Sequence, residues 1–580
     1  MSPATATATA TATDAPASEA HAYPLLIKQL LLTPLAVRPQ QEIVYGDKVR
    51  FDYRTLQTRI GQLAGLLTSL GVKRGDTVAV MDWDSNRYLE SYFAVPMIGA
   101  VLMMVNIRLA PEQIAYTLNH SGARVLLANR EFLPVLETID EQLPDLRTRI
   151  LLADEDGPLP TGFVTEYEAG LREATPITCF PDFDENTRAT TFYTTGTTGL
   201  PKGVYFSHRQ LVLHSLAAMA ALGSASSQGR LHRDDVYMPI TPMFHVHAWG
   251  MPYVATLLGI KQVYPGRYLP GKLLALIARE KVTFSHCVPT ILHMLLGHAT
   301  AADTDLRSWK VIIGGAALPR ALAQQALARG IDIFGGYGMS ETCPLLTVAQ
   351  IDAHALDGAD EELSLRTKAG IPVPLVDLRI VDEDMNDVAH DGVATGEVVV
   401  RTPWLTQGYL HNPDASTALW AGGYLHTGDI GNIDGGGYLR VADRIKDVIK
   451  TGGEWISSLA LEDIIALHPA VNEVAVIGIS DTKWGERPLP LVVRQDGSDV
   501  TEADIIELVA ARSRSGDISR YAIPDRVSFV DSLERTSVGK INKKKLRGLH
   551  DPEAVADDPG SHEADPPSHR GTSEAHLQRR

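Results

Sequence analysis

Short apolar runs alternate with stretches of helical periodicity through the first part of the chain. Five leucine or isoleucine residues recur at helical spacing just before Gly71, a residue type that favours helix ends: Leu56, Ile60, Leu63, Leu67 and Leu70. Three short apolar runs follow at 78–81, 125–127 and 150–152. Runs of this kind are typical of strands buried on both faces, and helices must then cover the sheet. The pattern therefore predicts an α/β fold.

The texture of the sequence changes after Leu365. Strand-like segments dominate there, at 375–381 and 397–401. Because 580 residues are too many for one compact core, at least two domains are expected. We assign 25–444 to a large N-terminal domain whose last part is rich in strands.

A second change near Arg444 introduces a small α/β unit. A helix is expected over 461–467 and a strand over 474–479, and Thr501 opens a capping box that starts another helix. We assign 445–550 to a small C-terminal domain. The Ala/Thr-rich residues 1–24 and the polar residues 551–580 are predicted to be disordered tails.

Composition limits the function classes. The chain has 53 Lys plus Arg against 70 Asp plus Glu, a formal charge of -17, which argues against a general nucleic-acid binder. Its three cysteines, Cys179, Cys287 and Cys343, form no CxxC pair, so neither a disulfide framework nor a zinc site is supported. The N-terminal run fits neither a signal peptide nor a transit peptide. These features predict a protein of the reducing cytoplasm.

The longest apolar stretch, 92–107, is too short to span a bilayer and contains Pro96 and Gly99. We interpret it as a buried helix and expect no integral membrane segment.

The segment 193–203, YTTGTTGLPKG, carries the strongest chemical signal. Glycines let backbone N–H groups approach an anion, hydroxyls add donors, and Lys202 adds positive charge. A strand-like lead and a helix-like exit flank the run, as expected of a loop that grips phosphates. It is not a Walker A loop, which needs GxxxxGK[ST]. A near match at 266–273 ends in Leu273, which has no hydroxyl for Mg²⁺, and is interpreted as a turn entering a helix.

The run TTGTTGLPKG resembles the phosphate loop of the adenylate-forming superfamily, which includes acyl-CoA synthetases, luciferases and peptide-synthetase adenylation domains. Further motifs match in order over about 45–547. The resemblance implies a large N-terminal domain of two αβ-layered subdomains plus a β-rich subdomain, followed by a small mobile C-terminal α+β domain.

The resemblance also implies an ATP site. In the family, the tyrosine of GGYGMSET (335–342) stacks on adenine, the hydroxyl contacts phosphate and the glutamate holds Mg²⁺. A Gly-Gly-Ala loop lines the adenine, and the aspartate of HTGD accepts the ribose hydroxyls. Thr194 and Glu341 are the implied magnesium ligands. The implied ATP-binding residues are Thr194, Thr195, Gly196, Thr197, Thr198, Gly199, Lys202, Gly315, Ala316, Gly336, Tyr337, Gly338, Ser340, Thr342, Asp429, Arg444 and Lys446.

The segment 443–456, DRIKDVIKTGGEWI, resembles the family's interdomain hinge and the loop beside the second-step site. The implied hinge and coenzyme A residues are Lys446, Lys450, Gly452, Gly453, Glu454 and Trp455. Lys540, in RTSVGKI, resembles the catalytic lysine, whose long stem can bring an ammonium to the α-phosphate. Lys543 to Lys545 follow it in a basic run that would ordinarily be a solvated face.

The segment 242–250, PMFHVHAWG, resembles the segment that flanks the acyl pocket in bacterial medium- and long-chain fatty acyl-CoA synthetases. His245 is implied to lie near the carboxylate with a catalytic role, together with Lys540 and Glu341. Trp249 is implied to line or gate the acyl tunnel, and Gly336 to border it. His245 and His247 at i, i+2 are a weak metal signal without a third ligand.

The predicted reaction has two steps. A carboxylate, already ionised at neutral pH, attacks the α-phosphorus of ATP and releases pyrophosphate; the small domain then rotates, and coenzyme A attacks the acyl-AMP. The implied cosubstrates are ATP, coenzyme A and a carboxylic acid, with Mg²⁺ as cofactor. A medium- or long-chain fatty acid leads, and an arylalkanoic or other acid is the alternative. The sequence leaves the oligomeric state open, a homodimer being one state it allows.

Other activities remain open within the resemblance. A luciferase-type monooxygenase shares every nucleotide motif, and an acyl-AMP ligase would stop after the first step. A peptide-synthetase module is disfavoured because no carrier domain follows Arg547. A non-catalytic binding protein would be expected to have lost Lys540 or Glu341, yet both are present.

Overall fold

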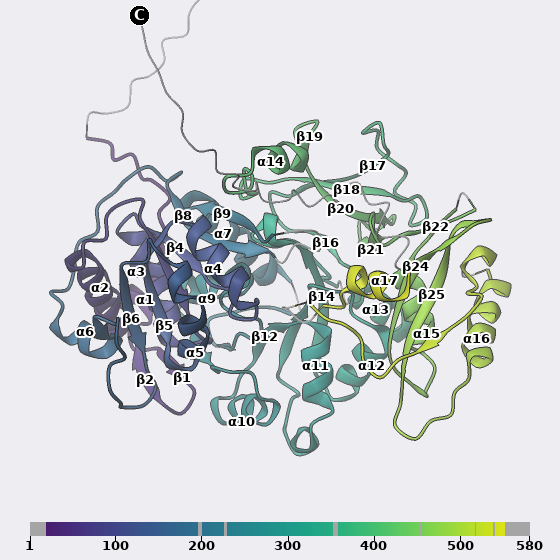
Figure 1. Cartoon of the computed structure of the whole chain (residues 1–580), viewed down its shortest axis with the longest axis horizontal. Coiled ribbons are helices and arrows are strands. Elements are labelled where there is room, and N and C mark those ends of the chain that lie inside the picture. The colour runs from purple at the N-terminus through teal and green to yellow at the C-terminus, as the bar shows by residue number, and fades with distance from the viewer. Residues whose placement is uncertain are drawn as a thin grey trace, which may run out of the picture.

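The structure is a computed structural model. It describes residues 19–194, 200–225, 229–351, 356, 358–452, 454–516, 518–536 and 540–551, with the side chain of Trp455 left out. Within these ranges the strands form four sheets (Figure 1). Within the same ranges, no helix is long and apolar enough to cross a membrane.

The first sheet has seven strands in the order β7-β6-β5-β3-β4-β8-β9 and is parallel except for the β8–β9 pair. Its strands are β3 (Thr77–Met81), β4 (Val101–Met104), β5 (Ala123–Asn129), β6 (Thr148–Leu152), β7 (Thr165–Glu166), β8 (Arg188–Thr194) and β9 (Lys202–Ser207). Nearby helices are α2 (Tyr53–Ser69), α3 (Asn86–Met97), α4 (Pro111–His120), α5 (Leu133–Ile139) and α6 (Tyr167–Glu173). The three apolar runs and the helix before Gly71 are confirmed.

The second sheet has nine strands in the order β16-β15-β14-β13-β12-β10-β11-β1-β2. Its strands are β1 (Glu42–Tyr45), β2 (Val49–Asp52), β10 (Val236–Tyr237), β11 (Lys261–Tyr264), β12 (Phe284–Cys287), β13 (Lys310–Ile313), β14 (Asp332–Gly338), β15 (Leu345–Val348) and β16 (Ile371–Pro372). The helices of this part are α1 (Leu32–Val37), α7 (His208–Ser224), α9 (Met251–Leu258), α10 (Pro270–Glu280), α11 (Pro289–Leu296), α12 (Arg320–Ala328) and α13 (Ala359–Arg366). The near match to a Walker A loop is a turn into α10, as predicted.

The third and fourth sheets follow in chain order and lie at the top and the right of Figure 1. The third is antiparallel: β17 (Asp377–Val381), β18 (Gly396–Arg401), β19 (Trp420–Ala421), β20 (Tyr424–Ile433) and β21 (Leu439–Arg444), with α14 (Pro413–Leu419). The fourth contains β22 (Ile449–Thr451), β23 (Glu454–Ile456), β24 (Val471–Asp481), β25 (Gly485–Arg494) and β26 (Ser528–Phe529), with α15 (Ser458–Ile465), α16 (Glu502–Arg514) and α17 (Lys543–His550). The predicted large α/β part with a small C-terminal part is confirmed, and the capping box at Thr501 is present.

The prediction of one buried helix over 92–107 is wrong. Helix α3 ends at Met97, and Gly99 takes a left-handed φ of 78° that a continuing helix cannot contain. The chain then enters strand β4 at Val101, fully buried in the first sheet. This apolar stretch therefore contains the end of a helix, a turn and a strand.

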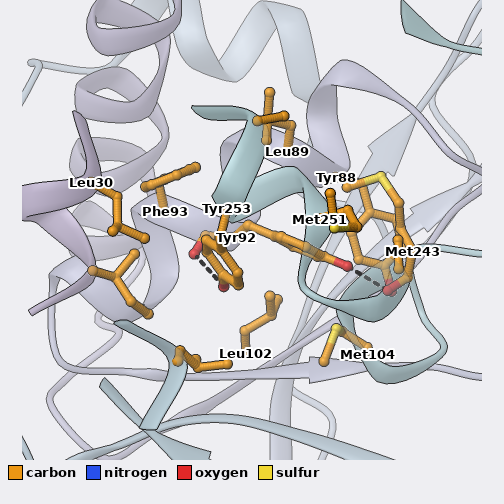
Figure 2. Close-up of a cluster of buried hydrophobic side chains, with 14 of the residues drawn as sticks. Leu30, Tyr88, Leu89, Tyr92, Phe93, Leu102, Met104, Met243, Met251 and Tyr253 are labelled. Atoms are coloured by element: carbon orange, nitrogen blue, oxygen red, sulfur yellow. Dashed lines mark hydrogen bonds between the residues drawn. The ribbon is translucent and has the colours of Figure 1, made fainter. Parts of the chain in front are cut away.

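Both parts of that stretch pack into the cluster drawn in Figure 2, where side chains of α3 and β4 meet Met243 and Met251. The Tyr92 hydroxyl donates to the carbonyl oxygen of Met243 at 2.5 Å, and the Tyr253 hydroxyl donates to the carbonyl oxygen of Tyr92 at 3.2 Å. All these side chains are buried. The core therefore fixes the segment that begins at Pro242, which carries His245 and Trp249.

Strand β14 reaches its neighbours so closely that only glycine fits at two of its positions. A Cβ at Gly338 would lie 1.8 Å from the carbonyl oxygen of Pro344, and one at Gly335 would lie 2.3 Å from that of Lys368. Neither obstacle is the end of a flexible side chain; both are backbone. The glycines of GGYGMSET thus serve main-chain packing around the strand that carries Tyr337.

We predict that Gly338→Ala lowers the melting temperature by several degrees, since overpacking against backbone costs about 3 kcal/mol. Gly223→Ala is the matched control, because nothing lies within 4 Å of its added Cβ and it sits in helix α7; it should melt at or above the wild-type temperature. Thermal unfolding followed by circular dichroism measures both. Equal melting temperatures for the two variants would contradict the close approach.

Candidate active site

A cavity of about 900 Å³ is lined by residues of the first, second and third sheets and by residues in and just before helix α17. Residues from separate sequence motifs line it together. Of the predicted site residues, the lining includes Thr194, Lys202, His245, Trp249, Gly315, Gly336, Tyr337, Gly338, Ser340, Glu341, Arg444, Lys446 and Lys540. Segments separated by more than 300 residues of chain therefore contribute to one site.

The base of the phosphate-loop segment is a β-hairpin. Thr194, at the end of β8, pairs with Lys202, at the start of β9, and both line the cavity. The Lys202 ammonium lies 4.8 Å from the ring centre of Tyr409, a cation–π distance. The predicted loop residues Thr195, Gly196, Thr197, Thr198 and Gly199 lie outside the described residues.

Glu341 is a buried carboxylate, 7% exposed, that faces this cavity. Burial raises its pKa, and the Tyr409 hydroxyl, which donates to Oε1 at 2.8 Å, opposes the rise. A carboxylate taken out of water is stabilised in its charged form by a cation. Glu341 and Thr194 both line the cavity, and carboxylate and hydroxyl oxygens are of the type that a hard cation prefers.

Three side chains form a charged corner at one side of the cavity. Asp429, 4% exposed, accepts from the Tyr337 hydroxyl at 2.7 Å, and its other oxygen lies 3.2 Å from Nε of Arg444. Tyr337 and Arg444 line the cavity, whereas Asp429 stands behind them. The carboxylate therefore orients the two groups that face a ligand.

The segment carrying His245 and Trp249 contains a left-handed turn. The four residues Val246–Trp249 have φ values of 48°, 56°, 46° and 58°, a conformation that costs about 1–2 kcal/mol per residue for L-amino acids. His247, fully buried, holds the turn through a 2.8 Å hydrogen bond between Nε2 and Thr190 Oγ1 and through an edge contact with Phe192. Strain of this kind survives only where surrounding contacts fix it.

The turn directs His245 and Trp249 into the cavity. The Trp249 ring lies 5.0 Å from that of His286, and one of its ring carbons is 3.0 Å from where a Cβ of Gly314 would be. Burial, helped by the nearby charge of Lys540, lowers the pKa of His245 to about 3. His245 is thus neutral at physiological pH.

A second, small cavity of about 50 Å³ adjoins the first and shares four residues with it: His245, Trp249, Gly315 and Lys540. Its other lining is mixed, with Ile240, Val288 and Ile291 beside polar groups of Thr241, Thr290, Tyr268 and Arg108. This cavity is lined by two of the predicted acyl-pocket residues, His245 and Trp249.

Lys540 joins the two cavities. Its Cε is 3.4 Å from where a Cβ of Gly315 would be, so the glycine leaves room for the lysine stem. Burial and the neighbouring Arg444 lower the Lys540 pKa to about 8, against the opposing effect of Asp429 and Glu341. The lysine is therefore poised to carry charge at neutral pH and to lose it in mildly basic solution.

Some predicted residues lie away from the cavity. Ala316 is exposed, and the Thr342 hydroxyl is bonded to backbone at Met339 and Pro344. Lys450, Gly452 and Glu454 belong to the β22–β23 region of the fourth sheet and do not line the cavity. Gly453 and the side chain of Trp455 lie outside the described residues. Nine of the predicted ATP-binding residues thus line the cavity with Lys540, whereas of the predicted coenzyme A residues that the structure describes only Lys446 does.

The family model "AMP-binding enzyme" matches residues 33–410, and "AMP-binding enzyme C-terminal domain" matches residues 460–540. The chain belongs to the AMP-binding enzyme family. A long-chain-fatty-acid–CoA ligase of Thermus thermophilus is 42% identical over 87% of this chain and 90% of the relative. A 3-methylmercaptopropionyl-CoA ligase of Ruegeria lacuscaerulensis is 38% identical over 90% of this chain and 97% of the relative.

Among solved structures, the anthranilate CoA ligase AuaEII in complex with anthranoyl-AMP superimposes with a TM-score of 0.80 at 25% identity, covering 92% of this chain and 99% of that one. The resemblance stated from the motifs is confirmed by these matches. The assignment of ATP, coenzyme A and a carboxylic acid as substrates fits the family.

Sequence reasoning missed several side chains of this AMP-binding enzyme's cavity. Tyr409 contacts both Glu341 and Lys202, yet no motif singled it out. Lys543, in a basic run of the kind that is ordinarily solvated, is only 9% exposed and lines the cavity with Lys544 and Arg547. The basic run itself was the available signal, but charge spacing alone does not tell a buried lysine from a solvated one.

We predict that acyl-AMP formation by this AMP-binding enzyme falls as pH rises through about 8, because the charged Lys540 is lost there instead of near its ordinary pKa of 10.5. The measurement is kcat/KM for ATP against pH in ATP–pyrophosphate exchange. Lys540→Arg keeps its charge over this range, so its slower reaction should lack the basic limb. A basic limb shared by both proteins would contradict the assignment to Lys540.

Proposed function

We propose that the chain is an ATP-dependent acyl-CoA ligase. It activates a carboxylic acid, foremost a medium- or long-chain fatty acid, as acyl-AMP and then transfers the acyl group to coenzyme A. The observation that carries the proposal is the entry of Lys540 into a cavity that also holds Glu341, Lys202 and the His245–Trp249 turn. The relative from Thermus thermophilus, 42% identical to this chain, is a long-chain-fatty-acid–CoA ligase.

The residues of the cavity act by positioning and charge neutralisation. The substrate carboxylate is ionised at neutral pH and needs no general base, which agrees with a neutral His245. His245 orients the carboxylate by a hydrogen bond, and the Lys540 ammonium stabilises negative charge that grows on the oxygens around the α-phosphorus. Lys202 holds the outer phosphates, while Tyr337 and Arg444 hold the nucleoside.

The site fits one magnesium ion delivered with ATP. Thr194 and Glu341 would hold it, both lining the cavity. When bound, such an ion neutralises phosphate charge and orients the polyphosphate. The tie from the Tyr409 hydroxyl to Glu341 keeps the carboxylate facing the cavity.

The second step, transfer of the acyl group to coenzyme A, uses the predicted hinge and coenzyme A residues. We propose 25–444 and 445–550 as the two domains, with the hinge at Lys446 between strands β21 and β22. Rotation there would remove Lys540 and bring the loop around Gly452 to the acyl-AMP. The free thiols of Cys179, Cys287 and Cys343 are in keeping with a cytoplasmic enzyme.

A non-fatty carboxylic acid is the second candidate substrate. The acyl-side cavity holds only about 50 Å³ with Trp249 in place, enough for a few carbon atoms. The 3-methylmercaptopropionyl-CoA and anthranilate ligases named above are relatives of this kind. A longer chain requires the Trp249 ring to leave its place against Gly314 and His286.

We predict that Lys540→Ala abolishes acyl-AMP formation but retains thioester formation from supplied acyl-AMP and coenzyme A. Removal of the ammonium takes away transition-state stabilisation in the first step alone, a loss of about 10²–10³ or more. ATP–pyrophosphate exchange and acyl-CoA release from synthetic acyl-AMP measure the two steps separately. An equal loss in both would rule out the role given to Lys540.

We predict that Trp249→Ala shifts the substrate profile toward longer or bulkier acids by about tenfold or more in kcat/KM ratio, since removal of an indole enlarges the acyl side of the site. The profile is measured with saturated acids of increasing length. Trp309→Phe, in a different core cluster, is the control for general effects of losing a buried indole. An unchanged profile would place Trp249 outside the acyl path.

A further inference from the structure

A buried polar chain joins strand β21 to helices α15 and α17, next to Lys540. We propose that Asp443, Ser458 and Lys543 form a latch that holds Lys540 in the cavity, and that these three are positioning residues for acyl-AMP formation. The inference rests on the proposed function, because Lys540 matters only if that reaction occurs.

The hydrogen bonds of the latch are continuous. Lys543 Nζ donates to Ser458 Oγ at 2.6 Å, and Ser458 Oγ donates to Asp443 Oδ2, also at 2.6 Å. The backbone N–H of Ser458 donates to the same carboxylate oxygen at 2.6 Å. Lys543 also pairs with Glu462 at 2.7 Å. One ammonium and one hydroxyl thus serve two carboxylates from different parts of the fold.

The latch is withdrawn from water. Ser458 is 0% exposed, Asp443 2% and Lys543 9%. The two carboxylates raise the pKa of Lys543, so the ammonium stays charged. Buried charge that loses its partner is costly, whereas surface pairs contribute little. The arrangement is consequently close to all-or-none, which suits a contact that holds one orientation.

The latch spans two sheets. Asp443 lies in β21, which pairs with β20 in the third sheet, and Arg444 beside it faces the cavity. Ser458 begins α15 and Lys543 begins α17, both of which pack against β24 in the fourth sheet. The ties therefore cross the point where the chain passes from one sheet to the next.

Lys543 is three residues from Lys540, and the intervening chain is fixed. The backbone N–H of Thr536 donates to the carbonyl oxygen of Lys540 at 2.7 Å, and that of Asn542 donates to Glu534 at 2.8 Å. A second tie on the same helix joins Arg547 to Asp447 at 2.8 Å. Holding the start of α17 therefore sets how far Lys540 reaches into the cavity.

A variant that breaks the latch should slow acyl-AMP formation and leave thioester formation unchanged. Ser458→Ala removes the relaying hydroxyl, keeps the backbone bond to Asp443 and leaves the surrounding packing intact. We expect ATP–pyrophosphate exchange to fall about tenfold, the effect of one buried hydrogen bond to a charged group. Thioester formation from supplied acyl-AMP should stay within about twofold of wild type. Lys543→Met should give a larger fall in exchange alone.

Lys545→Met is the matched control. Lys545 lies on the same helix and pairs with Glu534 at the surface, so its loss should leave both half-reactions unchanged. Trypsin gives an independent readout, because Lys446 is exposed in the connection between β21 of the third sheet and β22 of the fourth. Cleavage there should be about tenfold faster in Ser458→Ala than in wild type or in Lys545→Met, since proteolysis follows the population of the open form.

ATP–pyrophosphate exchange by the wild-type protein tests the proposed function without reference to the latch. Failure of the proposed function can therefore be distinguished from failure of the latch. The latch is overturned if wild type exchanges and Ser458→Ala exchanges equally fast. It is also overturned if both half-reactions fall by the same factor with a lowered melting temperature, which would mean structural damage only. Unequal loss with faster cleavage supports it.

Discussion

The close approach of main chains around strand β14 is the constraint on which the site depends. Without Cβ atoms at Gly335 and Gly338, the strand packs against backbone of Lys368 and Pro344 at distances that no other residue permits. This packing turns Tyr337 and the residues after it toward the cavity instead of into a core. The two glycines therefore shape the site through main-chain geometry, and Gly338 also lines the cavity.

Charge is distributed unevenly in this chain, and burial adjusts it where the chemistry lies. An overall formal charge of -17 coexists with a cavity lined by Lys202, Arg444, Lys446 and Lys540. Burial moves the two key groups in opposite ways, raising the pKa of Glu341 and lowering that of Lys540 to about 8. Each group is stabilised in its charged form by a neighbouring charge of opposite sign, which the proposed complex of magnesium and ATP would supply.

The sequence predicts the fold class and fewer than half of the residues that line the cavity, and the reasons for the missed residues are physical. Glycine- and hydroxyl-rich motifs are informative because they need special backbone geometry, and Thr194, Lys202 and Lys540 duly meet. Burial of Lys543 depends on Glu462, a partner about eighty residues earlier in the chain, and periodicity says nothing of such pairs.

Local conformation was the other blind spot. The left-handed turn at Val246–Trp249 is held by tertiary contacts of His247, because Val246, Ala248 and Trp249 are residue types that disfavour a positive φ. Over 92–107 apolar composition predicts a single helix, because composition alone cannot distinguish a buried helix from a buried strand. At both places packing overrides local preference.

The central claim is that this AMP-binding enzyme couples acyl-AMP formation to thioester synthesis. The most direct measurement is release of AMP from ATP with a panel of carboxylic acids, with and without coenzyme A. We expect the enzyme to release AMP and acyl-CoA in equal amounts only when coenzyme A is present. Fatty acids of medium or long chain should be the best substrates. Pyrophosphate release that yields a stable acyl-AMP whether or not coenzyme A is added would contradict it.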